Sequence, residues 1–355
     1  MNAGNIKGAL LEYIVRNLLK NCGFTNVRAD NLYSFERGGL FFINGKGAAH
    51  DADIIMNPPI QMPFTYPTQL LFECKAHENT TNLTMVRNAL GLRNDLNDFE
   101  IVTKESLLKR KNNKRAAYAI ENRTRFLYQV GVASVNDFTK PSIEFATNNK
   151  IPLLSLSWFL GIASIRAFNN INKSLIDSFD AKDIQNLYKF LKDREGNLQD
   201  DKYERAKKLL EDSNNIIGNF VTESNATIQR VYVGLLETGD MVFLSTCSEN
   251  NILNQQNGFA SLKAKIYWSN NNPNFWTLTI YNGNQYNEQT DFNFYLPERI
   301  FNQWKKFNLD KSVALEIKQN FFSKVFVFNQ KNNPETPFSI INIDRDWLDR
   351  IIQQQ

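Results

Sequence analysis

The sequence predicts an α/β fold for the first half of the chain, followed by a helical connector and a β-rich C-terminal domain. Helix-like and strand-like segments alternate to about residue 160, and the pattern then turns helical and strongly charged to about residue 215. Short aromatic or β-branched runs separated by Asn- and Gly-rich turns follow. At 355 residues the chain is long enough for two domains, and we place the parts at 1–165, 166–219 and 220–355.

The first part opens with a predicted helix. Leu11, Ile14 and Leu18 recur at three- and four-residue steps within residues 7–22, and Gly23 is a natural stop. The later elements follow from runs of apolar residues and from turn signals. We expect a hairpin or meander over 33–56, strands over 24–29, 70–76, 126–135 and 151–156, and helices over 81–97 and 139–149.

The last part is predicted to be mostly strands. Its aromatic residues fit either an ordinary β-sandwich core with polar turns or, less commonly, a surface that stacks on bases. Target recognition, signal sensing and partner docking all remain open for it. The expected strands are 231–236, 241–244, 264–268, 276–281, 292–296 and 324–328, with one helix over 298–307.

Composition excludes several classes of protein. Hydrophobic residues make up 42% and charged residues 22% of the chain, as in ordinary soluble globular proteins, and no run of 18 apolar residues or signal-peptide pattern occurs. The three cysteines are widely spaced and form no zinc motif. His50 and His77 are the only histidines, so a His-rich metal site or a Ser-His-Asp triad is hard to build. We expect a cytoplasmic protein that does not enter a membrane.

The segment from Lys104 to Arg125 is a local basic cluster, because it contains eight Lys or Arg residues and only two acidic residues, Glu105 and Glu121. Such a cluster suits contacts to phosphates. A solvated helix face explains it equally well.

The strongest chemical signal is the strand-like stretch 70–76. Side chains alternate across a strand, so Glu73 and Lys75 share one face while Cys74 points to the other. Unpaired charges are energetically costly on a buried strand, so two of them on one face suggest a functional role. Asp53 lies upstream of Glu73 and Lys75, on another short predicted strand. Asp53 and Glu73 suit Mg²⁺, which needs only one or two protein carboxylates, and the backbone carbonyl of Cys74 is a candidate third ligand. Taken alone, the pattern is weak and has many chance matches, and an exposed Glu and Lys on a solvent face is the commoner explanation of it.

The surrounding residues resemble the Mrr-like branch of the PD-(D/E)XK restriction-endonuclease superfamily. The similarity covers about residues 7–158 in the family's order. It implies a restriction-endonuclease-like core, in which helices flank a mixed central sheet, and an Mg²⁺-dependent DNA endonuclease for which Mn²⁺ can substitute. The matching blocks are Lys-Gly-Ala-Leu-Leu-Glu at 7–12, Gly-Lys-Gly-Ala-Ala-His-Asp-Ala-Asp at 45–53, the Glu-x-Lys strand at 70–76, Val-Arg-Asn-Ala-Leu-Gly at 86–91, and a strand-helix-strand block at 131–151.

The resemblance assigns Asp53 and Glu73 as metal ligands and Lys75 as the catalytic lysine. Lys46 stands where the family usually has arginine, and Asp51 where it usually has glutamine. Asp51 shares a strand face with Asp53 and is a possible extra ligand, but Asp53 holds the family position.

Six further residues around these three receive assignments. Glu12 either completes the metal shell through water or forms a surface pair with Arg16, one helical turn later. His50 is expected to be structural or to position substrate. We assign nucleic-acid contacts to Lys46, His77, Arg87 and Asn88.

These observations predict a nuclease of bacterial restriction or anti-phage defence, in which the C-terminal domain controls target choice or activation. DNA is the expected partner, with a homodimer or a partner in a defence complex. The alternatives are a nuclease effector subunit that acts on RNA or single strands, and a silent nucleic-acid-binding scaffold.

Overall fold

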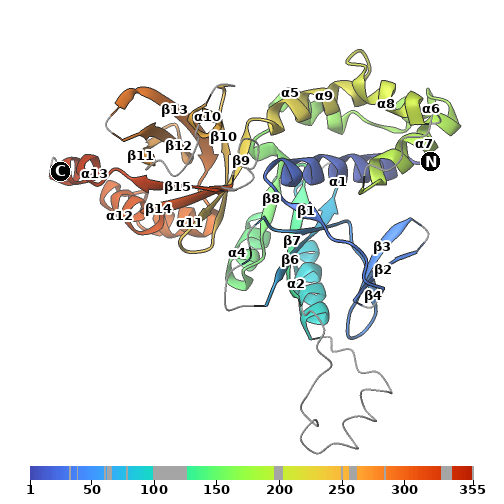
Figure 1. The fold of residues 1–355 in the computed structure, drawn as a ribbon, viewed down its shortest axis with the longest axis horizontal. Coiled ribbons are helices and arrows are strands. Elements are labelled where there is room, and N and C mark those ends of the chain that lie inside the picture. Colours follow the sequence, from blue (N-terminus) through green and yellow to red (C-terminus); the bar gives the residue numbers. More distant parts are fainter. Residues whose placement is uncertain are drawn as a thin grey trace, which may run out of the picture.

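The structure is a computed structural model. It describes residues 1–31, 33–37, 39–59, 61, 66–76, 79–98, 126–195, 203–248, 251–255, 262–283, 285–328 and 338–353. An N-terminal α/β part and a C-terminal barrel lie side by side, joined through a layer of helices (Figure 1). No helix in these ranges is both long and apolar enough to span a membrane.

Helix α1 (Ala3–Asn21) is the central support of the N-terminal part. The side chain of Asn2 caps its first turn by accepting a hydrogen bond from the Asn5 N–H. Eleven of its residues are buried, because its apolar side chains cover more than one face. The helix ends at the residues that the sequence predicted, with Gly23 in the left-handed region at φ 90°.

The main sheet has five strands in the order β1-β5-β6-β7-β8. Strand β5 runs antiparallel to β6, while β6, β7 and β8 run parallel to one another. The predicted strands in this region are therefore confirmed, and the sheet is mixed. The bounds are β1 Thr25–Asn26, β5 Ile54–Asn57, β6 Thr68–Lys75, β7 Leu127–Ser134 and β8 Leu153–Ser155.

Helices cover both faces of this sheet. Phe72 belongs to the same hydrophobic core as α1, whereas Leu71 packs with α2 (Leu83–Asn97) and α4 (Lys140–Asn149). Strand β6 is thus buried on both faces over its first part, and its last three residues, from Glu73 onward, are partly exposed. This places Glu73 and Lys75 where the core gives way to solvent.

A small second sheet contains β2 (Ser34–Arg37), β3 (Leu40–Asn44) and β4 (Ala49–Asp51) in that order. It is the meander expected for residues 33–56, and it leads directly into β5. In Figure 1 it projects beside α2.

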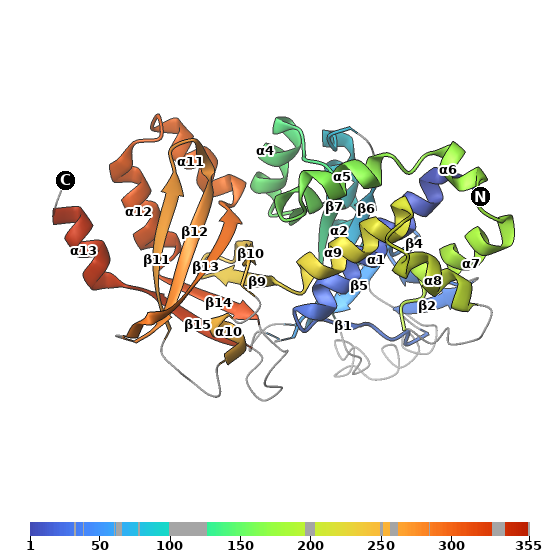
Figure 2. The ribbon, with the colours of Figure 1, turned by 90° about the horizontal axis from the view of Figure 1, so that it is seen from above.

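The helical connector packs against α1 and is not a separate layer in solvent. Helices α5, α7 and α9 contribute Phe168, Leu187 and Phe220 to the core that contains Leu10 of α1. Helix α9 lies along α1 and leads into the barrel (Figure 2), and it spans the expected boundary between residues 219 and 220. The helices are η2 Leu156–Trp158, α5 Ile162–Asn169, α6 Lys173–Asp177, α7 Ala181–Lys192, α8 Glu204–Glu211 and α9 Ile216–Ile228.

The C-terminal part is a closed barrel, so the expectation of a β-sandwich was wrong. Its strands follow the order β10-β13-β12-β11-β15-β14-β9. Closure comes from β15, which pairs in parallel with β11 and antiparallel with β14. The strands are β9 Val231–Leu236, β10 Met241–Ser245, β11 Leu262–Ser269, β12 Asn272–Asn282, β13 Gln285–Tyr295, β14 Lys324–Phe328 and β15 Phe338–Ile343.

Four helices accompany the barrel where the sequence predicted one. Helix α11 confirms the expected helix, and α12 and α13 pack on the barrel core through Leu315 and Trp347. Trp276 and Trp304 fill that core with edge-to-face contacts, ring centroids 5.7 Å apart. The helices are α10 Ile252–Gln255, α11 Glu298–Lys306, α12 Lys311–Phe321 and α13 Arg345–Gln353.

Strand β9 is shared between the two parts. Val231 and Val233 belong to the core of α1, whereas Tyr232 and Leu236 belong to the barrel core. The period of two along a strand therefore gives each core one face of β9. On β10, Phe243 makes a similar outward contact, with its ring centroid 6.1 Å from that of Phe159.

Candidate active site

Asp53 directly precedes β5, and Glu73 lies on the neighbouring antiparallel strand β6. Ile54, the residue after Asp53, pairs with Phe72, the residue before Glu73. The backbone N–H of Cys74 donates a 2.8 Å hydrogen bond to Asp53 Oδ2. This bond fixes one oxygen of Asp53 beside the strand and leaves the other for a ligand.

Lys75 lies with Glu73 at the end of β6. Its Nζ atom is 3.0 Å from Glu73 Oε2, and both side chains are about a fifth exposed (23% and 21%). Burial raises the pKa of Glu73, Lys75 opposes that rise, and the charge of Asp53 adds to it. Burial alone would lower the pKa of Lys75, but Glu73 outweighs it and the pKa is raised. The lysine is therefore charged and held beside the two carboxylates.

A second ion pair interacts electrostatically with Asp53. Lys192, the last residue of α7, places its Nζ 2.7 Å from Glu12 Oε2 and 2.8 Å from Oε1. Burial and then the charge of Asp53 raise the pKa of Glu12 to about 7, although Lys192 opposes this. Asp53 thus links two pairs electrostatically, Glu73–Lys75 and Glu12–Lys192.

The expectation of a surface pair between Glu12 and Arg16 was wrong. Both residues are buried, at 5% and 3% exposure, and Arg16 donates from Nη2 to the carbonyl oxygen of Leu191. Lys192 was not predicted as a site residue, because it lies 180 residues from Glu12 in the sequence. The one signal of its burial is its position directly after Ile184, Leu187 and Leu191, the buried residues of α7.

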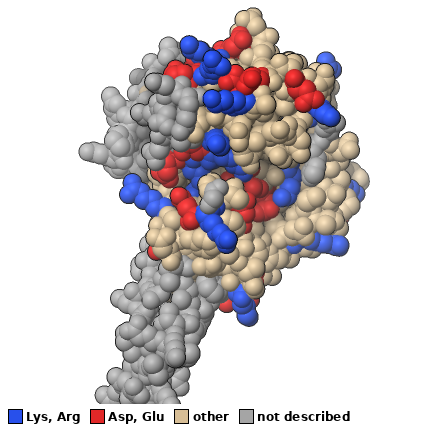
Figure 3. Space-filling view, turned by 90° about the vertical axis from the view of Figure 1, so that its right-hand side faces the viewer, with Lys and Arg blue, Asp and Glu red and all other residues tan. Residues whose placement is uncertain are grey.

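We use "carboxylate cluster" for Glu12, Asp51, Asp53 and Glu73. The charge of Asp53 raises the pKa of each of the three others, and burial is the larger cause of the rise in each. The face that carries β2–β4 and α7 is hollowed near its centre, and acidic and basic side chains gather around the hollow (Figure 3).

The donor set fits Mg²⁺ or Mn²⁺. Both prefer hard oxygen ligands, and Mg²⁺ needs only one or two carboxylates because it keeps several waters. Asp53 and Glu73 would hold the ion, since they are adjacent and repel each other without it. Among the described residues no group of three His, Cys, Asp or Glu is gathered tightly enough to form an all-protein cage. The role of the Cys74 carbonyl stays a prediction.

His50 has a structural contact. Its Nε2 lies 2.7 Å from Oδ2 of Asp95, near the end of α2, and the Gly47 N–H donates to Oδ1 of the same carboxylate at 2.7 Å. The hydrogen bond from His50 lowers the pKa of Asp95. Gly45 lies so close that a Cβ atom there would meet Asp95 Oδ2 at 2.0 Å. Asp95 thus ties the loop before β4 to the helix after β6.

Replacing Asp95 with alanine is expected to reduce the free energy of unfolding by about 1–2 kcal/mol, because two hydrogen bonds are lost. Urea denaturation measures this, and hydrogen exchange should show faster opening at Gly47. Asp98→Ala is the matched control, because Asp98 is exposed at the end of the same helix. Equal losses in the two variants would contradict a specific role for Asp95.

The residues assigned to nucleic-acid contacts are placed as follows. Lys46 is exposed, and its backbone N–H donates to the Asp95 carbonyl. Arg87 and Asn88 are exposed on α2, with the Arg87 guanidinium 5.7 Å from the centroid of the Phe145 ring. His77 and the basic cluster of residues 104–125 lie outside the described residues.

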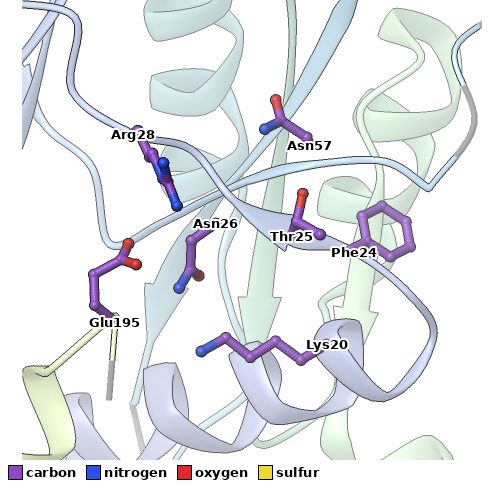
Figure 4. Close-up of a pocket in the computed structure, with 7 residues that line it drawn as sticks. All are labelled: Lys20, Phe24, Thr25, Asn26, Arg28, Asn57 and Glu195. Atoms are coloured by element: carbon purple, nitrogen blue, oxygen red, sulfur yellow. The ribbon is translucent and has the colours of Figure 1, made fainter. Parts of the chain in front are cut away.

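A separate cavity of about 610 Å³ lies at the far end of β5 (Figure 4). Four residues separate Asn57 in its wall from Asp53, which corresponds to about 13 Å along the strand. The Asn26 Oδ1 atom in its lining is buried and has no hydrogen-bond partner. The cavity is lined by Lys20, Phe24, Thr25, Asn26, Arg28, Asn57 and Glu195.

The three cysteines are free thiols. Cys22 is buried, Cys74 is partly buried and Cys247 is exposed. Burial raises the pKa of Cys74 well above its usual value, and the nearby carboxylates add to the rise. Its thiol is therefore protonated and packs as a small apolar group.

Comparison with known proteins shows no family. No family model and no curated protein matches the sequence. A crystal structure of a protein of unknown function, AF1548, aligns over 62% of this chain and 100% of its own, with 15% identity and a TM-score of 0.31.

Proposed function

We propose that the chain is a metal-dependent endonuclease that hydrolyses DNA phosphodiester bonds. The observation that carries the proposal is that β6 holds both carboxylates: the Cys74 N–H donates to Asp53 Oδ2 at 2.8 Å, and Lys75 Nζ lies 3.0 Å from Glu73 Oε2. The resemblance of residues 7–158 to Mrr-like nucleases assigns roles to the same three residues.

The arrangement suits this chemistry. A divalent metal held there would neutralise charge on the phosphate and lower the pKa of a bound water. Asp53 and Glu73 would orient the ion, because Cys74 fixes Asp53 and Lys75 fixes Glu73. The Lys75 ammonium would then lie beside the scissile phosphate, where it stabilises the charge that develops in the transition state.

We further propose a role in bacterial restriction or anti-phage defence, with the barrel controlling where or when the chain cuts. The packing of β9 and β10 against the core of α1 supports this, because it gives the barrel a direct route to that core. Cuts in both strands of a duplex would require two sites, which a homodimer provides.

Cleavage of supercoiled plasmid and phage DNA tests the proposal. We expect nicked and then linear DNA with Mg²⁺ or Mn²⁺, and intact DNA with EDTA, because removing the metal removes its charge from the site. Single-stranded DNA and RNA are assayed in parallel, and preferential cutting of either would change the substrate class. A folded protein that cuts none of these substrates with either metal would contradict a self-sufficient nuclease.

A further inference from the structure

Lys192 is a cation from a helix remote in sequence that reaches the carboxylate cluster. Its Nζ contacts both oxygens of Glu12, and Glu12 and Asp53 together raise its pKa although burial opposes the rise. Burial raises the pKa of Asp51, and the charge of Lys192 opposes that rise. One ammonium thus interacts with three of the four carboxylates of the cluster.

The position of Lys192 is built by packing. Helix α7 buries Ile184, Leu187 and Leu191 in the core that contains α1. Arg16 donates to the Leu191 carbonyl, and the carbonyl of Arg194 accepts hydrogen bonds from the side chains of Lys20 and Asn26. Three donors from the sheet and from α1 therefore hold the segment on both sides of Lys192.

This pair differs from a surface ion pair. The side chains of Lys192 and Glu12 are only 19% and 7% exposed, so forming the pair removes both charges from water at considerable cost. Lys75 already supplies the lysine that the proposed chemistry requires. The second lysine therefore needs another explanation, and its charge has the sign of a metal ion.

We infer that Lys192 is a resident cation of the site. It holds Glu12 in place when no divalent metal is bound, and it competes with the metal for the negative charge of the cluster. Lys192 is thus a positioning residue supplied by the connector, and the metal affinity of the site depends on the docking of α7. This inference rests on the proposed function, because it takes Asp53 and Glu73 of the carboxylate cluster as the metal ligands.

The test measures Mn²⁺ binding to the full chain by electron paramagnetic resonance of free Mn²⁺. Lys192→Met and Lys192→Gln remove the charge and are expected to lower the Mn²⁺ dissociation constant by about tenfold or more, because a nearby positive charge is lost in a partly buried site. Lys192→Arg keeps the charge and should leave the constant near that of the unaltered protein. Lys182→Met, at an exposed position in the first turn of the same helix, is the control.

Two neutral replacements guard against a variant that does not fold, and circular dichroism identifies the folded ones. Unchanged or weaker Mn²⁺ binding in a folded neutral variant would overturn the inference. So would Lys192→Arg and Lys182→Met if they tightened Mn²⁺ binding as much as the neutral Lys192 variants do. Plasmid cleavage by the unaltered protein is scored separately. Cleavage with unchanged Mn²⁺ affinity removes only the role of Lys192, whereas absence of both cleavage and Mn²⁺ binding in every protein removes the proposed function as well.

Discussion

Replacing Asp53 with asparagine is expected to slow Mg²⁺-dependent DNA cleavage by at least about a hundredfold, and by as much as a thousandfold. In the unaltered protein the Cys74 N–H donates to Asp53 Oδ2 at 2.8 Å. The side-chain oxygen of asparagine can accept the same hydrogen bond, so we expect the local fold to be kept. The charge that would hold the metal is lost. The initial rate at which supercoiled plasmid disappears measures the effect.

The matched control for this prediction is Asp51→Asn. Asp51 lies two residues earlier, exposed at the end of β4, and the sequence alone left it as a possible extra ligand. We expect this variant to keep most of the activity, because it is Asp53 that β6 holds next to Glu73, through the hydrogen bond from the Cys74 N–H. Loss of cleavage in Asp51→Asn with retention in Asp53→Asn would exchange the two roles.

Lys318→Met is expected to stabilise the chain by roughly 1–3 kcal/mol at neutral pH. Lys318 is 3% exposed on α12, and burial lowers its pKa from 10.5 to about 8, a shift that corresponds to about 3 kcal/mol. Its ammonium lies 4.4 Å from the ring centroid of Trp268 and 5.0 Å from that of Trp347, which recovers part of the cost. Urea denaturation measures the gain.

The gain should depend on pH in a defined direction. The folded pKa of Lys318 lies below the unfolded value, so the unfolded chain binds more protons between about pH 8 and 10.5. The cost of burial is therefore fully present below pH 8 and disappears as the pH rises through this range. The difference in the free energy of unfolding between Lys318→Met and the unaltered protein should therefore shrink as the pH rises through this range. Lys311→Met, at an exposed position on the same helix, should show no such change.

The N-terminal elements were predictable because their patterns are local. The buried run before Glu73, the three- and four-residue steps of α1 and the stop at Gly23 each express a period or a turn within a few residues. The barrel was not predictable in the same way. Its closure depends on the pairing of β9 with β14 and of β11 with β15, and a strand's sequence does not specify its distant partner.

The same distinction applies to the candidate site. The proximity of Asp53 and Glu73 follows from the pairing of β5 with β6, two strands close together in the sequence, and the strand period sets Glu73 and Lys75 on one face. Lys192 reaches Glu12 only because α7 packs across α1. That contact is a product of tertiary packing, and an isolated lysine at the end of an amphipathic helix is an ordinary surface feature in sequence.

Strand β9 also constrains how this chain can diversify. Val231 and Val233 belong to the core of α1, while Tyr232 belongs to the barrel core. A different barrel that replaced this one would therefore need a first strand whose outer face is apolar. A genetic crossover in the loops after β9 would retain that strand, whereas one between α9 and β9 would have to restore both its faces at once. Inherited variation in the barrel is therefore expected to accumulate beyond β9, while β9 itself changes in step with α1 and α9.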